Sequence, residues 1–170
     1  MVRRIFISYQ HADQLTAKGF NLMRYNNSLA LDFVGRHLLD PVKSNDPGYI
    51  GEKIREQIKY TSVTVVLIGD NTADSTWVER EIERSLAKEP PNGLLGIRLN
   101  PDVEIPESLK VHGAEILDWF KPEDVHEFQD AIERAAASAR RSLYMPANSA
   151  STCRRLVADS TLRGVQNSIA

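Results

Sequence analysis

Cysteine is nearly absent from this sequence, which has Cys153 as the single example among 170 residues. One cysteine cannot form an internal disulfide, and it excludes a metal site built from several thiolates. The histidines do not compensate, because they are scattered and lack the spacing of metal ligands. They are His11, His37, His112 and His126. We therefore expect no metal site, and a reducing, cytoplasmic setting.

Long apolar runs are also missing. No stretch approaches the roughly 20 apolar residues that span a bilayer, and the apolar run in MVRRIFISYQ is too short for a signal peptide. The net charge of −2 argues against a strongly basic surface for nucleic acid. No Gly-x-Gly-x-x-Gly motif follows the first apolar run, which excludes a classical dinucleotide-binding fold. We expect neither a membrane nor nucleic acid as a partner.

The chain alternates between apolar, β-branched runs and amphipathic segments. The runs predict strands at residues 4–9, 29–34, 63–68, 94–99 and 114–119. The amphipathic segments predict helices at 14–25, 49–60, 76–88 and 121–143. Strands that alternate with helices form parallel sheets with right-handed crossovers. The sequence therefore predicts an α/β fold, a flavodoxin-like three-layer sandwich whose five-stranded parallel sheet has the order 2-1-3-4-5.

The length fits one domain, at residues 1–143, followed by a tail at 144–170. The tail lacks long periodicity, so it is expected to be a short helix or disordered.

The stretch from Tyr60 to Lys88 contains the features on which most of the functional interpretation depends. Residues 63–68 read as a buried central strand, and Thr76 with Glu79 fits a capping box at the start of the next helix. Trp77 and Glu81 are four residues apart, so they are neighbours on one helix face. That face lies near the carboxyl end of the strand, the edge at which open α/β sheets bind ligands.

Three stretches in the expected order resemble a TIR domain, and specifically the TIR subunit of the bacterial Thoeris anti-phage system. They are FISYQHAD at residues 6–13, the loop after the second predicted strand, and SVTVVLIGDNTADSTWVEREI at residues 62–82. The resemblance covers roughly residues 3–140. It implies an enzyme that cleaves the bond between nicotinamide and ribose in NAD and makes a cyclic or linear ADP-ribose.

The resemblance also implies roles for particular residues. The family's catalytic glutamate follows the tryptophan by four residues, which makes Glu81 the catalytic candidate with Trp77 beside it. The loop at 38–49 corresponds to a mobile loop over the substrate. Further candidates to contact the substrate are Ser8, Tyr9 and His11 at the end of the first strand, and Ser44 and Asp46 in the loop. NAD would be a substrate with no separate cofactor, and the partners would be an effector that the product activates and further copies of the chain.

Plainer interpretations stay open for most of these residues. Taken alone, Glu81 reads as a solvated acid on a helix surface and Trp77 as a half-buried core aromatic. Ser44 and Asp46 fit turn chemistry, and Asp13 fits a helix cap better than a ligand.

Two other functions also fit the sequence. One is a TIR-type interaction module without enzymatic activity, and the other is an enzyme like the nucleoside deoxyribosyltransferases. The Trp-x-x-x-Glu spacing favours the NAD-cleaving enzyme, because a pure scaffold has no need of a carboxylate there.

Overall fold

The computed structural model describes residues 2–25, 33–36, 46–119 and 125–144. Its strands are β1 (Arg3–Tyr9), β2 (Phe33–Arg36), β3 (Val63–Ile68), β4 (Gly93–Arg98) and β5 (Glu115–Asp118). All four pairings between neighbouring strands are parallel, and the order is β2-β1-β3-β4-β5. The predicted α/β class with a parallel sheet is confirmed, and the observed strand order is the expected one.

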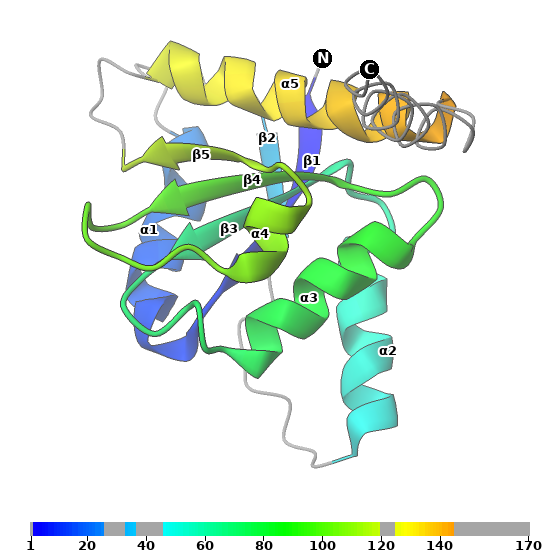
Figure 1. The fold of residues 1–170 in the computed structure, drawn as a ribbon, viewed down its shortest axis with the longest axis horizontal. Helices are drawn as coiled ribbons and strands as arrows, with labels where there is room; N and C mark the ends of the chain where they lie inside the picture. The colour runs from blue at the N-terminus through cyan, green and yellow to red at the C-terminus, as the bar shows by residue number, and fades with distance from the viewer. Residues whose placement is uncertain (1, 26–32, 37–45, 120–124, 145–170) are drawn as a thin grey trace, which may run out of the picture.

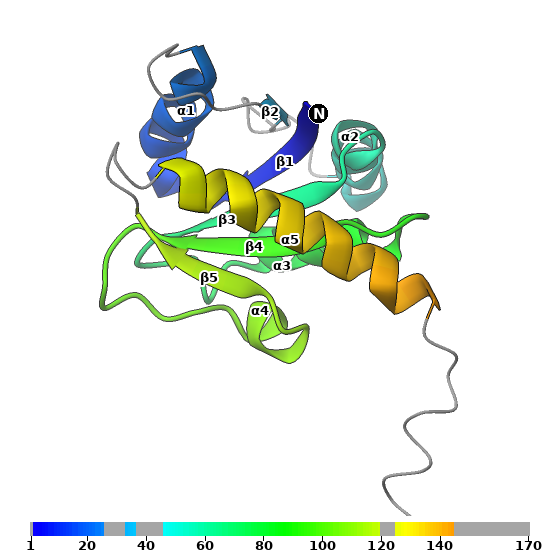
Figure 2. The same ribbon diagram turned by 90° about the horizontal axis from the view of Figure 1, so that it is seen from above.

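Helices cover both faces of this sheet (Figures 1 and 2). The helices are α1 (Gln14–Leu22), α2 (Pro47–Ile58), α3 (Thr76–Ala87), α4 (Glu107–Val111) and α5 (Val125–Tyr144). Short 3-10 turns lie at His11–Asp13 and Met23–Tyr25. The α1 and α5 helices pack on one face, and α2, α3 and α4 pack on the other. Within the described ranges, no helix is both long and apolar enough to cross a bilayer.

The position of β3 explains its composition. All six of its residues are buried, because the strand lies at the centre of the sheet with helices on both sides. Alternate residues point to opposite faces, so Val65 and Leu67 join the core under α1 and α5. Val66 and Ile68 join the core under α3 and α4.

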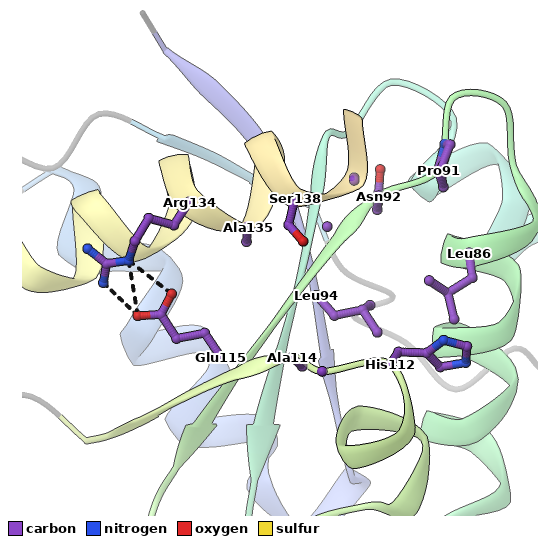
Figure 3. A pocket seen from close by; sticks show the side chains of 13 residues that line it. Leu86, Pro91, Asn92, Leu94, His112, Ala114, Glu115, Arg134, Ala135 and Ser138 are labelled. Carbon is purple, nitrogen blue, oxygen red and sulfur yellow. Dashed lines mark hydrogen bonds and ion pairs between the residues drawn. The ribbon is translucent and has the colours of Figure 1, made fainter. Parts of the chain in front are cut away.

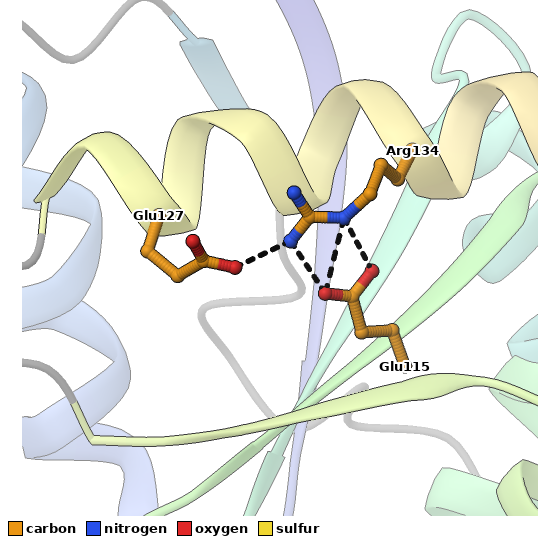
Figure 4. Close-up of polar contacts among 3 residues, drawn as sticks. All are labelled: Glu115, Glu127 and Arg134. Carbon is orange, nitrogen blue, oxygen red and sulfur yellow. Dashed lines mark hydrogen bonds and ion pairs between the residues drawn. The ribbon is translucent and has the colours of Figure 1, made fainter.

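A close backbone contact fixes α5 against the sheet. A Cβ atom added at Gly93 in β4 would lie 2.0 Å from the carbonyl oxygen of Ala135, so only glycine allows this approach. Ion pairs surround the contact: Arg134 reaches Glu115 of β5 and Glu127 of its own helix (Figure 4). These pairs are exposed and contribute little energy, so the close packing at Gly93 sets the position of α5.

Buried polar side chains tie the end of α3 to the sheet. Asn92 donates its two amide hydrogens to Thr61 and Thr64, at 2.8 and 2.9 Å. Thr64 donates to Ser85, and Ser85 donates to the backbone carbonyl of Glu81. The last two turns of α3 are therefore held by hydrogen bonds as well as by apolar contacts.

Several sequence-based boundaries were wrong. The second strand continues to Arg36 rather than ending at 34, and a short helix, α4, forms between the predicted strands at 94–99 and 114–119, where no helix was predicted. The first helix ends at Leu22, and the 3-10 turn follows it. Residues 145–170 lie outside the described part of the chain, so the division at 143/144 stays a prediction.

One predicted helix cap was also wrong. The N-cap of α3 is Ser75, whose hydroxyl accepts a hydrogen bond from the amide of Val78, and not Thr76. Asp13 stands at the N-cap position of α1, as predicted, but its side chain makes no capping hydrogen bond. Its carboxylate lies against Gly69 at the end of β3, where a Cβ would come within 2.4 Å of an Asp13 oxygen.

We expect Gly93→Ala to lower the free energy of unfolding by about 1–3 kcal/mol, because the added methyl group would collide with the backbone of α5. Gly19→Ala in α1 is the matched control, since a Cβ there meets nothing within 4 Å. Alanine should stabilise that helix by about 0.5–1 kcal/mol. Chemical denaturation measures both values, and a Gly93→Ala protein as stable as the parent would contradict the close approach.

Candidate functional site

The central group of the site is the Glu81 side chain, which is 2% exposed. One of its carboxyl oxygens, Oε2, accepts a hydrogen bond of 2.6 Å from the Ser8 hydroxyl. The other, Oε1, accepts one of 2.9 Å from the indole nitrogen of Trp77, one helical turn earlier. The interpretation of Glu81 as a solvated surface acid is therefore wrong, because the group is enclosed and both of its oxygens have donors.

Burial dominates the electrostatics of this carboxyl. Loss of water around Glu81 raises its pKa from 4.5 to about 8, since the enclosed site disfavours the charged form. The hydrogen bonds from Ser8 and Trp77 and the charge of Arg84 lower the pKa, but by less. Glu81 is thus mostly protonated at neutral pH, and a positive charge placed beside it would favour its ionisation.

The strand β1 supplies one wall of the site. Ser8 is fully buried and faces α3, while its neighbour Tyr9 points to the opposite side of the sheet and joins the core under α1 and α5. The structure therefore brings Ser8 to Glu81 and does not bring Tyr9 there. His11 lies in the exposed turn after the strand.

Trp77 belongs partly to the core. Its ring is half-buried and packs against the cluster of Phe6, Ile54 and Ile58 below α2. Because its indole nitrogen also donates to Glu81, the side chain links the packing of α2 to the position of the carboxyl. The interpretation of Trp77 as a half-buried core aromatic is confirmed, and its contact with a substrate stays a prediction.

Of the two candidate residues in the loop, the structure describes Asp46 and not Ser44. Asp46 is the N-cap of α2, and its carboxylate accepts a hydrogen bond from the amide of Gly48 at 2.9 Å. This is the turn chemistry that the sequence also allowed. Ser44 lies outside the described residues.

Sequence reasoning missed Arg84, which lies three residues after Glu81 on α3. Its guanidinium packs on Gly51 of α2, where a Cβ would come within 2.5 Å of Nη2. The i, i+3 spacing from Glu81 was a signal that could have drawn attention to it.

A pocket of about 540 Å³ lies at the other edge of the sheet, where β4 and β5 begin (Figure 3). Leu94, His112, Glu115, Arg134 and Ser138 are among its lining residues. It is separate from Glu81, which lies toward the carboxyl ends of the strands. Among the residues that the structure describes, no group of acidic, histidine or cysteine side chains could hold a metal ion.

Comparison with known proteins gives a family match. A family model described as "Thoeris protein ThsB, TIR-like domain" matches residues 6–104. A Bacillus cereus (strain MSX-D12) protein named "Putative cyclic ADP-D-ribose synthase ThsB1" is 27% identical over 125 residues. The match covers 71% of this chain and 64% of that protein, so the chain spans less than two thirds of the length of this relative.

Solved structures resemble the chain more distantly. The TIR domain of the Toll-related receptor TRR-2 from Hydra magnipapillata is 18% identical, with a TM-score of 0.49 over 78% of this chain and 97% of that one. The diflavin flavoprotein A3 from Nostoc sp. is 9% identical, with a TM-score of 0.45 over 83% and 96% of the two chains.

The raised pKa of Glu81 gives a pH-dependent stability. In the unfolded chain the carboxyl ionises near 4.5, whereas in the folded protein it keeps its proton to about 8. The unfolded state therefore binds fewer protons between these values, so the contribution of Glu81 to stability is greatest below pH 4.5 and falls as the pH rises to 8. We expect Glu81→Gln to be more stable than the parent at pH 8 and equal to it near pH 4, as measured by denaturation across this range.

The glutamine amide is a fair replacement, because it can accept from Trp77 and donate to Ser8. Glu83→Gln removes a charge at an exposed position of the same helix and serves as the control. If the difference in unfolding free energy between Glu81→Gln and the parent is the same at pH 4 and pH 8, Glu81 is not held in its protonated form.

Proposed function

The chain belongs to the family of TIR-like domains of the Thoeris protein ThsB, and we propose from this that it cleaves the nicotinamide–ribose bond of NAD. The product is a cyclic or linear ADP-ribose that signals to an effector in bacterial anti-phage defence. The single observation that carries the proposal is the Glu81 carboxyl, enclosed between β1 and α3 with Ser8 and Trp77 as its hydrogen-bond donors. The name of the B. cereus relative, a cyclic ADP-D-ribose synthase, supports the cyclic product.

The chemistry requires few protein groups. The electron pair of the broken C–N bond moves to the ring nitrogen, so nicotinamide leaves as a neutral molecule and needs no general acid. The ribose becomes an oxocarbenium-like cation, as in glycoside cleavage. Attack by water, or by the adenine end of the same molecule, completes the reaction and releases one proton.

The carboxylate of Glu81 would stabilise the positive charge that develops on the ribose in this reaction. The pyridinium of NAD is already positive, and its approach would lower the pKa of Glu81 and favour the carboxylate. The carboxylate would then lie beside the ribose as positive charge moves onto it. A charge placed in a site with little water is worth several kcal/mol in such a transition state.

The resting contacts set a condition for this role. The Glu81 side chain is almost fully covered, so substrate contact requires a group around the carboxyl, such as Trp77 or Ser8, to move. The half-buried Trp77 is the group with more freedom, because Ser8 lies on a central strand.

The same contacts support a second candidate, a TIR-type interaction module without catalysis. A carboxyl that links β1 to α3 through two hydrogen bonds is also a structural tie. The two functions differ in what happens to NAD, so the activity of matched variants separates them.

The test of the proposed function follows nicotinamide release from NAD by the purified protein, with the nucleotide product identified by mass spectrometry. We expect Glu81→Gln to lower turnover by at least about a hundredfold, because it removes the charge that stabilises the cation. Glu107→Gln, which removes an exposed charge from α4, should stay within about twofold of the parent. Equal activity of the parent and Glu81→Gln would refute the assignment of Glu81. No release from any of the three proteins, at any protein concentration tried, would favour the interaction module.

The pH profile tests the state of the carboxyl. Because the carboxylate is the active form, kcat/KM should rise with pH along a limb set by the pKa of Glu81 in the free enzyme, about 8. Ser8→Ala removes a hydrogen bond that lowers this pKa, so it should shift the limb to higher pH. A limb that stays in place in Ser8→Ala would show that another group controls the rate.

A further inference from the structure

A groove of about 430 Å³ runs between α2 and α3, which lie side by side on the same face of the sheet (Figure 1). Its lining residues are Ile50 of α2 and Arg80, Glu83, Arg84 and Ala87 of α3. Two of these five carry a guanidinium group. Arg80 and Arg84 are four residues apart, so they are neighbours along one face of the helix.

Arg84 differs from the other half-buried arginines of the described chain. Arg3 pairs with Glu133, Arg98 pairs with Asp118, and Arg24 bonds to the hydroxyl of Tyr25. Arg84 makes no hydrogen bond or ion pair with any residue that the structure describes. A partly desolvated guanidinium presents several donors in a fixed fork, and these match the oxygens of a phosphate or carboxylate.

The helix opposite is shaped around this side chain. Gly51 lies in the interior of α2, where glycine is less stable than alanine by about 0.5–1 kcal/mol. A Cβ at this position would lie 2.5 Å from Nη2 of Arg84, so glycine leaves the space that the guanidinium fills. Arg84 therefore packs against Gly51 of α2 and forms part of the groove wall.

The groove also adjoins the proposed site. Arg84 follows Glu81 by three residues, about 4.5 Å along the helix axis, and its charge acts on the Glu81 carboxyl. In a dinucleotide, a phosphate is attached to the same ribose that carries nicotinamide. A carboxyl at the ribose and a cation at that phosphate must therefore lie about one sugar apart.

We propose that Arg84, with Arg80, forms a phosphate-binding subsite in the groove between α2 and α3. Resting on the proposed function, the group that it takes is the diphosphate of NAD. Glu83 carries a negative charge at the rim, so the two arginines leave the groove with a net charge of +1. One phosphate-bearing ligand, held chiefly by Arg84, suits that balance.

Binding is measured on the Glu81→Gln protein, so that no turnover is required. The probes are ADP-ribose, inorganic pyrophosphate and adenosine, followed by calorimetry. Arg84→Met should weaken ADP-ribose binding about tenfold to a hundredfold, the range for losing a charge-assisted hydrogen bond. Arg80→Met should have a smaller effect, because Arg80 is more exposed. Arg84→Lys keeps the charge without the fork and should fall between Arg84→Met and the parent.

The matched control is Arg55→Met, which removes an exposed arginine from α2 outside the groove and should leave binding unchanged. Equal affinity for ADP-ribose in Arg84→Met and Arg55→Met would overturn the subsite. Adenosine binding that depends on Arg84 would also overturn it, because adenosine has no phosphate. Pyrophosphate binding that depends on Arg84, without any ADP-ribose binding, would keep the phosphate subsite and refute its link to NAD.

Discussion

The buried carboxyl of Glu81 is the constraint on which the rest of this site depends. A carboxyl group without water must find hydrogen-bond donors in the protein or stay protonated. Here one donor comes from Ser8 on a central strand and the other from Trp77 on the same helix. Because these donors come from two layers of the fold, the direction of α3 across the sheet and the place of the carboxyl are set together.

Burial also makes the protonated form of Glu81 the favoured one, and a positive charge nearby would oppose this preference. In the resting protein, loss of water favours the protonated carboxyl of Glu81 and raises its pKa to about 8. A cationic substrate such as the proposed NAD would act in the opposite direction, so its binding and the ionisation of Glu81 would favour each other. The protein keeps a group that is unfavourable for folding at neutral pH, which is a departure from local stability expected at a functional site.

The sequence predicted what depends on local pattern and missed what depends on tertiary neighbours. The apolar run at 63–68 and the four-residue spacing on α3 were enough to place β3 and the face that carries Trp77 and Glu81. The choice of Ser75 over Thr76 as the cap was not fixed by pattern, because both hydroxyls suit an N-cap. Tyr9 was grouped with Ser8 by sequence proximity, whereas strand alternation sends it to the opposite face.

Hydrogen bonds near both ends of α3 explain how the position of Glu81 is fixed. At the carboxyl edge of the sheet, Ser75 holds the first turn through the amide of Val78. At the other end, Ser85 donates to the carbonyl of Glu81 and accepts from Thr64 in the sheet. The Glu81 backbone is therefore anchored through a buried hydroxyl, and its side chain through Ser8. A helix held only by apolar contacts could slide or rotate slightly at low cost, whereas here such a movement would leave buried polar groups without partners. The buried polar groups thus fix the position of Glu81. The proposed reaction takes place at a single carbon atom and would require such a fixed position.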